Sequence, residues 1–250
     1  MHPDPHAGKF AASGPREETA PAASIVLDRA RILQRMGYPP ASLAQVPSHV
    51  AEVVEVACTD APALIEPRGL WRFAGLEFGD RPGELVCASR RLAVGGIIAG
   101  QLRRSRQLAV FVVSIGSGLE REAERRFREG DPAVGHALSA IGSEVVEAWA
   151  EVVAGRIAAV AESGGWRWTN RYSPGYCLWD TGDQRTLFEL LPPRPAGVTL
   201  NEHALMSPLK SVSGIIGLGP EVEYRPYPCD RCGVEDCTHR LVESSGPPAA

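Results

Sequence analysis

The stretch DPAVGHALSAIGSEVVEAWAEVVAGRIAAV, residues 131–160, contains the longest helical pattern of the chain. Its apolar residues recur every three or four positions, which places them on or near one face of a helix: Val134, Leu138, Ile141, Val145, Trp149, Val152, Ile157 and Val160. An apolar face of this length needs other elements to cover it. We therefore expect this helix to be a central pillar of the domain.

The segments on either side of this helix predict a mixture of helices and strands. Residues 108–115 are rich in β-branched side chains and predict a strand, and residues 70–78 and 85–87 are expected to be extended as well. Further helices are expected at residues 25–36, 49–58, 93–104 and 119–128. Turns and short strands are expected after the long helix, up to Tyr227.

Composition and charge exclude several classes of protein. The 26 Lys and Arg residues against 30 Asp and Glu residues leave a net charge of −4, which does not favour binding to nucleic acid or to anionic lipid. The most apolar uncharged stretch, residues 108–119, is too short to span a membrane. Residues 1–24 lack the basic and apolar regions of a secretory signal, so we expect a cytoplasmic protein whose six cysteines are thiols or metal ligands.

The distribution of turn-forming residues predicts the domain boundaries. Residues 1–24 and 244–250 are mostly Pro, Gly, Ala and Ser, and we expect both segments to be disordered tails. Neither a repeat nor a linker divides the sequence between them. We expect one domain at residues 25–227 and a cysteine-rich segment at residues 228–243.

Three features have residue types suited to ligand binding. Glu147 and Glu151 are one helical turn apart and would hold a positively charged group together, although a solvated helix flank is the commoner meaning of this spacing. The stretch RYSPGY, residues 171–176, combines a cation, two phenols and a constrained turn, which suits a loop that grips a carboxylate and a ring or an ordinary turn. Lys210 is one of only two lysines, which hints at a need for a point charge.

The cysteines near the C-terminus have the spacing of metal ligands. Cys229, Cys232 and Cys237 form a CxxC followed by a third cysteine after four residues. His239, Cys177 or an external ligand would complete a tetrahedral zinc site, whereas three cysteines with an open iron position suit an iron–sulfur cluster. Three unligated thiols are the third interpretation. Cys58 and Cys87 lie among apolar residues and are expected to be small buried side chains.

Several motifs in one order resemble the activation, or reactivation, domain of cobalamin-dependent methionine synthase. They lie between residues 108 and 227: RYSPGY at 171–176, Gln184 with LFELL at 187–191, GVTLNE at 197–202, MSP at 206–208 and KSVSG at 210–214. The helical stretch EAWAE, residues 147–151, is similar to a glutamate-containing helix of that domain. The cysteine cluster is similar to what stand-alone relatives of the domain have.

This resemblance implies an α+β fold, a C-shaped single domain in which helices flank a twisted antiparallel sheet. It implies that Arg171 pairs with the carboxylate of S-adenosylmethionine and that Glu147 holds its amino group. Ser173, Gly175, Tyr176 and Tyr224 would line the same site. In the family, S-adenosylmethionine re-methylates a corrinoid whose cobalt has reached the inactive Co(II) state, with one electron from a reductase or flavodoxin.

The chain has no corrinoid, folate or homocysteine module, and no corrinoid ligand motif of the form DxHxxG. We therefore expect a stand-alone activation protein that acts on the cobalamin of a separate methyltransferase such as methionine synthase. The resemblance implies a methyltransferase-type activity within methionine biosynthesis. The competing hypothesis is a non-catalytic, metal-stabilised module that senses S-adenosylmethionine or caps a corrinoid protein.

Overall fold

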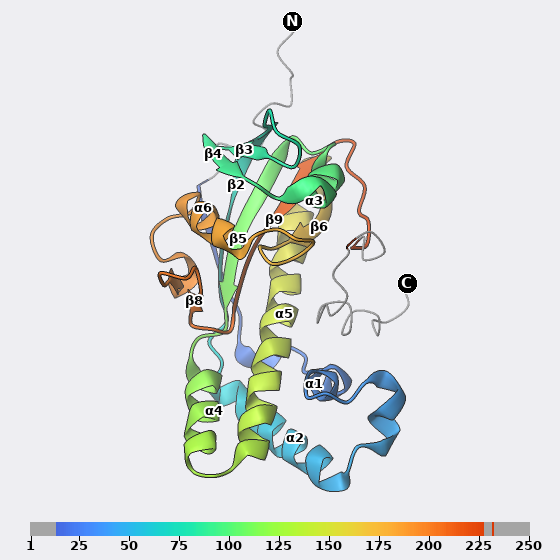
Figure 1. The fold of residues 1–250 in the computed structure, drawn as a ribbon, viewed down its shortest axis with the longest axis vertical. Coiled ribbons are helices and arrows are strands. Elements are labelled where there is room, and N and C mark those ends of the chain that lie inside the picture. The colour runs from blue at the N-terminus through green and yellow to red at the C-terminus, as the bar shows by residue number, and fades with distance from the viewer. Residues whose placement is uncertain (1–13, 228–231, 233–250) are drawn as a thin grey trace, which may run out of the picture.

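The computed structural model of the protein describes residues 14–227 and Cys232. Its longest element is helix α5, Pro132–Ser163, about 48 Å long at 1.5 Å per residue. The side chain of Asp131 caps the helix by accepting a hydrogen bond from the Val134 amide, and Pro132 occupies the first helical position. Figure 1 shows α5 extending from the sheet to the helices at the opposite end of the molecule. The predicted central pillar is confirmed.

The main sheet has seven strands, joined in the order β4-β3-β2-β5-β9-β6, and β1 pairs with β2 beside this path. Every recorded strand pair is antiparallel. The strands are β1 (Arg16–Thr19), β2 (Arg68–Phe78), β3 (Leu85–Cys87), β4 (Arg90–Leu92), β5 (Gln107–Ser114), β6 (Arg167–Tyr172) and β9 (Ser211–Gly219). A separate small sheet pairs β7 (Thr199–Leu200) with β8 (Met206–Ser207).

The two faces of the sheet bury two different apolar cores. Strand β5 is buried along its whole length, and its side chains alternate between the cores. Ala109, Phe111 and Val113 pack on the α5 side, while Leu108, Val110 and Val112 pack on the other side. Burial on both faces explains why this strand is a continuous apolar run.

Helices α1 (Arg29–Arg35), α2 (Ser48–Asp60) and α4 (Gly118–Arg128) pack with α5, whereas α3 (Gly95–Leu102) and α6 (Gln184–Glu189) contribute to the second core. Short 3-10 helices connect them: η1 (Ala22–Ser24), η2 (Pro40–Gln45), η3 (Ala61–Leu64), η4 (Thr181–Asp183) and η5 (Pro195–Gly197). In the described part of the chain, no helix is long and apolar enough to cross a membrane. The predicted α+β fold, a largely antiparallel sheet flanked by helices, is confirmed.

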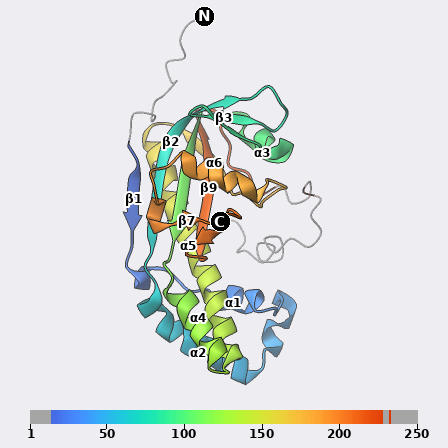
Figure 2. The same cartoon turned by 60° about the vertical axis from the view of Figure 1, so that its left-hand side comes forward.

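The N-terminal region differs from expectation at two points. Residues 16–19, expected to belong to a disordered tail, form β1 and pair with β2 at the edge visible in Figure 2. The Trp71 indole donates to Glu18 Oε1 at 3.0 Å and so ties β1 to its neighbour. The first helix begins at Arg29 instead of Ile25, because the Asp28 carboxylate accepts the Arg31 amide and starts the helix there.

Candidate functional site

A β-bulge in β6 determines which way the candidate site faces. Trp168 and Arg171 pair with Leu218 and Ile216, so two residues of β6 lie opposite one residue of β9 between these pairs. An extra residue shifts the alternation of side chains by one position. Arg171 therefore points to the same face as Trp168, toward α5, whereas an unbroken strand would direct it to the opposite face.

Side chains of the bulge replace the missing ladder hydrogen bonds. The Gly217 amide donates to Thr169 Oγ1 at 2.9 Å, and the Arg171 amide donates to Asn170 Oδ1 at 2.9 Å. Thr169 Oγ1 in turn donates to the Asn170 carbonyl at 2.7 Å. These buried backbone groups are thus satisfied without a regular strand, which allows the bulge to persist in the interior.

Arg171 meets two carboxylates of α5. Its Nη2 lies 2.5 Å from Glu147 Oε2, and its Nε lies 2.7 Å from Glu151 Oε1. The Arg171 side chain is only 3% exposed, whereas that of Glu147 is 22% exposed and that of Glu151 is 64% exposed. The sequence placed the two glutamates on one side of the helix, and the structure confirms this. The positive group that they hold is Arg171 itself.

The electrostatic surroundings keep this buried guanidinium charged. Burial acts to lower the pKa of Arg171, but Tyr227, Glu147, Glu151 and Tyr176 oppose this effect and raise the pKa well above its ordinary value. Two carboxylates thus hold this arginine in an environment of low dielectric constant. Proteins use arginine in such charge-assisted pairs to recognise carboxylates.

A cavity of about 370 Å³ opens beside this ion pair. Its polar lining includes Arg31, Glu144, Glu147, Glu151 and Arg171. Its apolar lining consists of Ile25, Val26, Ala148 and Val152. The volume falls within the range of about 300–1,000 Å³ that is usual for small-molecule sites, and such sites combine an apolar wall with a few charged groups.

The turn after β6 holds the other residues that the resemblance implied. The Tyr176 amide donates to the Ser173 carbonyl at 3.0 Å, and the Gly175 amide donates to the Trp179 carbonyl at 2.7 Å. Gly175 has a φ of 95°, a conformation that a side chain would strain. The Tyr176 hydroxyl lies 3.5 Å from Glu147 Oε1. Tyr176 is therefore at the edge of the Arg171 ion pair.

Two buried polar atoms of this segment have no hydrogen-bond partner within the described part of the chain. They are Nη1 of Arg171 and Oγ of Ser173. Both residues are more than nine-tenths buried. Buried polar atoms in native proteins are almost always paired. Two orphan atoms that are two residues apart in the sequence therefore indicate a place where a polar ligand completes the structure.

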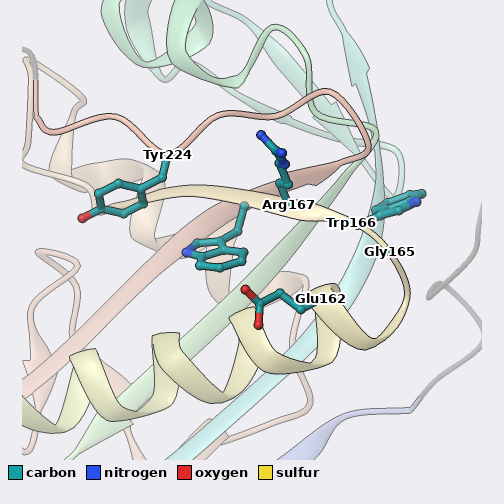
Figure 3. Close-up of a pocket in the computed structure, with 6 residues that line it drawn as sticks. Glu162, Gly165, Trp166, Arg167 and Tyr224 are labelled. Carbon is teal, nitrogen blue, oxygen red and sulfur yellow. The ribbon is translucent and has the colours of Figure 1, made fainter.

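The C-terminal tyrosines occupy two different places. Tyr227, which the sequence analysis missed, donates from its hydroxyl to the Arg171 carbonyl at 2.6 Å, and its ring packs edge-on against Tyr172 and Tyr176. Tyr224 lines a second cavity of about 400 Å³, which begins at the last turn of α5. Figure 3 shows Glu162 of α5 and Tyr224 on opposite sides of residues 165–167. The resemblance implied Tyr224 for the Arg171 site, but the hydrogen bond to Arg171 is made by Tyr227.

The expected metal site falls mostly outside the described residues. Cys229, Cys237 and His239 are not described, and Cys232 is buried. The part of the chain that the structure describes contains no group of three potential metal ligands. Cys58 and Cys87 are buried among apolar residues, as predicted. Burial raises the pKa of the Cys87 thiol to about 11.

Lys210 and Gln184 form links between elements away from Arg171. Lys210 Nζ donates to the hydroxyls of Ser139 and Ser143 at 3.2 and 2.9 Å, so the point charge joins the start of β9 to α5. Burial lowers the pKa of Lys210. Gln184 accepts from the Ser213 hydroxyl at 3.0 Å, which joins α6 to β9.

Comparison with known proteins explains why these motifs occur together. Residues 90–240 match the family described as "Vitamin B12 dependent methionine synthase, activation domain". The chain belongs to this activation-domain family. A solved structure described as "Crystal Structure of the MetH Reactivation Domain bound to AdoHcy" shares the fold, with a TM-score of 0.63 and 17% sequence identity over 87% of this chain and 82% of that chain. No curated protein matches the chain.

The family match covers the elements that build the Arg171 site. It includes α5, β6, the turn at residues 173–180 and β9. The resemblance inferred from the motifs is thereby confirmed. The first 89 residues lie outside the family match, and they contribute α1 and the residues Ser24–Val26 at the cavity.

Proposed function

We propose that this activation-domain protein binds S-adenosylmethionine by its amino acid end at the Arg171 site. The single observation that carries the proposal is the pair of orphan polar atoms, Arg171 Nη1 near the end of β6 and Ser173 Oγ in the turn that follows, where Arg171 lines a charged cavity. The solved relative is bound to AdoHcy, which is S-adenosylmethionine without its transferable methyl group. Ligand binding would give these atoms partners that the chain does not provide.

The charges of the site suit a ligand with both an anion and cations. Arg171 provides the positive charge for a carboxylate, and Glu147 provides a negative charge for an ammonium group. Ser173, Gly175 and Tyr176 form the turn next to them, and the proposal places them around the ligand. A zwitterion held between one fixed cation and one fixed anion has a defined orientation. Tyr227 supports Arg171 from its backbone side.

The proposed role is to support reductive methylation of the cobalamin of a separate methyltransferase. One electron from a reductase or flavodoxin would convert Co(II) to Co(I), whose electron pair would attack the methyl carbon of S-adenosylmethionine. The carbon–sulfur bond breaks, methyl-cobalt forms, and AdoHcy leaves. The chain contributes positioning of the methyl donor.

The proposal also includes a metal centre near the C-terminus. We place Cys229, Cys232 and Cys237 around zinc or an iron–sulfur cluster, and elemental analysis of the purified protein distinguishes the two.

Isothermal titration of the purified protein with S-adenosylmethionine tests the binding step. We expect saturable binding, and we expect Arg171→Lys to weaken it by about 2 kcal/mol, because lysine keeps the charge but loses the fork that pairs with a carboxylate. Arg128→Lys is the matched control, since Arg128 is an exposed residue of α4. Equal affinity of the Arg171→Lys variant and the wild-type protein would remove Arg171 from the site.

A spectroscopic assay then separates the proposed role from the competing one. The protein is mixed with a corrinoid methyltransferase in the Co(II) state, a reductant and S-adenosylmethionine labelled in its methyl group. Formation of methyl-cobalt with transfer of the label supports reactivation. Binding of S-adenosylmethionine without any change in the cobalt spectrum, with each candidate corrinoid protein, would favour a module that senses the donor or caps its partner.

A further inference from the structure

We propose that Glu151 is an internal competitor for the carboxylate of the ligand. Its carboxylate pairs with Nε of Arg171 and leaves this position when a carboxylate ligand binds. The inference rests on the proposed function for the identity of the ligand, but its geometric basis is independent. Glu147 remains paired with Arg171 when Glu151 leaves.

The geometry of the guanidinium leaves little room for a third carboxylate. Nε and Nη2 lie on the same edge of an arginine, and this edge is one that a carboxylate grips with two parallel hydrogen bonds. Glu151 takes Nε and Glu147 takes Nη2, so both donors of the edge are occupied. The remaining nitrogen, Nη1, is the unpaired donor of the proposed site, but it is shielded from the cavity. A carboxylate from the cavity therefore reaches Arg171, Nη1 included, only when one of the two glutamates that line the cavity moves aside.

The surroundings of the two glutamates decide which one leaves. Glu147 is mostly buried and lies within 3.5 Å of the Tyr176 hydroxyl as well as on Arg171. Glu151 is 64% exposed, and Arg171 is its only ion-pair partner among the described residues. An exposed carboxylate regains its hydration when it leaves, and exposed ion pairs contribute little free energy. Removing Glu147 would instead leave the buried charge of Arg171 without the more buried of its two counter-charges.

Glu151 also helps to compensate the buried charge of Arg171 until a ligand displaces it. Arg171 is 3% exposed, and a buried guanidinium without enough counter-charge is costly. Glu151 supplies the second counter-charge. It lines the cavity together with Arg171 and Val152, so it moves into solvent without any change in the backbone of α5. Because Glu151 must leave Arg171 before the ligand binds, the protein binds the ligand less tightly than it would without this competing carboxylate.

The test compares the wild-type protein with Glu151→Gln, which keeps the shape of the side chain and removes the competing charge. We expect the variant to bind S-adenosylmethionine about two- to sixfold more tightly, the range that follows from a weak exposed ion pair. We expect no change for 5′-methylthioadenosine, which has the same nucleoside but no carboxylate. Glu124→Gln, at an exposed residue of α4, should leave both affinities unchanged.

The outcomes separate this inference from the proposed function. Unchanged or weaker binding of S-adenosylmethionine by Glu151→Gln would overturn the inference and leave the proposed function intact. Equal tightening for both ligands would overturn it as well, because the effect would not depend on a carboxylate. If the wild-type protein does not bind S-adenosylmethionine, the proposed function is wrong. Methionine then serves as the probe: tighter binding by the variant supports the inference, and equal or absent binding overturns it.

Discussion

Arg171 carries a full charge at a place that is almost completely shielded from water. The cost of burying that charge is offset only because two carboxylates and the surrounding hydrogen bonds accompany it. The same side chain thus has two roles, one in the stability of the domain and one in the proposed binding of a ligand. Variants at this cluster need measurements of both.

Glu147→Gln separates the two roles at the level of one residue. The amide keeps the shape of the carboxylate but removes the more buried counter-charge of Arg171. We expect the free energy of unfolding to fall by about 1–3 kcal/mol and S-adenosylmethionine binding to weaken. Denaturant unfolding and calorimetric titration on the same preparation measure the two effects. Loss of stability with unchanged affinity would mean that Glu147 is structural only.

Individual site residues were easier to predict than their partners. Sequence spacing placed Glu147 and Glu151 on one side of α5, and motif resemblance singled out Arg171. That the three form one cluster depends on the sheet and helix packing together, which spacing alone does not specify. Tyr227 was missed for the same reason, since its contact with Arg171 joins residues 56 positions apart.

Elements with a strong, continuous pattern were predicted well. Helix α5 has an uninterrupted apolar face and strand β5 an uninterrupted apolar run, so local sequence determines both. Strand β1 has the polar sequence REET and owes its conformation to pairing with β2 and to the contact between Glu18 and Trp71. Such an edge strand has no pattern of its own to recognise.

Close packing at β9 provides a test at the level of elements. A Cβ atom at Gly214 would lie 2.6 Å from the Tyr172 carbonyl oxygen and 2.9 Å from the Phe111 ring, so Gly214→Ala must push strands or side chains apart. We expect a loss of about 1–3 kcal/mol in the free energy of unfolding. Gly155→Ala on α5 is the control, because its Cβ meets nothing within 4 Å.

The control variant has its own expected sign. Alanine favours a helix over glycine by about 0.5–1 kcal/mol, so Gly155→Ala should stabilise the protein. Urea denaturation followed by circular dichroism measures both variants. Equal stability of Gly214→Ala and the wild-type protein would show that the sheet accommodates a methyl group at this position, in conflict with the packing described above.

At the scale of the whole molecule, α5 connects parts that the sheet does not join directly. Its Glu144 accepts a hydrogen bond from Arg35 of α1 at 2.9 Å and lies 3.1 Å from Arg31. One turn further along, Glu147 holds Arg171 of the sheet. The helical end of the molecule and the candidate site are therefore attached to the same rigid element within one turn of each other.

The buried thiols and phenol make the stability of the whole domain sensitive to alkaline pH. Burial raises the pKa of Cys87 from an ordinary 9.0 to about 11 and also raises the pKa of Cys58 and Tyr172. Each group binds its proton more tightly in the folded state, so its contribution is complete below its unfolded pKa and is lost as the pH rises. The lowered pKa of Lys210 acts in the opposite direction.

We expect the free energy of unfolding to decrease between pH 9 and pH 11, with about 2–3 kcal/mol of the decrease due to Cys87. Denaturation under reducing conditions at several pH values measures this change. Cys87→Ala removes the titrating group, so its curve should be flatter than that of the wild-type protein over the same interval. Parallel curves for the two proteins would contradict the assignment.

The bulge in β6 makes the site depend on how many residues precede Arg171 as well as on which residues they are. Trp168 and Arg171 are three positions apart, and this odd spacing puts both side chains on the α5 face only because the bulge absorbs one residue. Deleting Thr169 or Asn170 would leave an even spacing, and a regular strand without the bulge would then still direct the arginine toward α5. Losing the bulge without losing a residue would instead turn Arg171 to the opposite face and abolish the site while the whole RYSPGY motif remained. Among relatives, the length of this strand is therefore as informative as the motif itself, because it indicates whether the site needs a bulge.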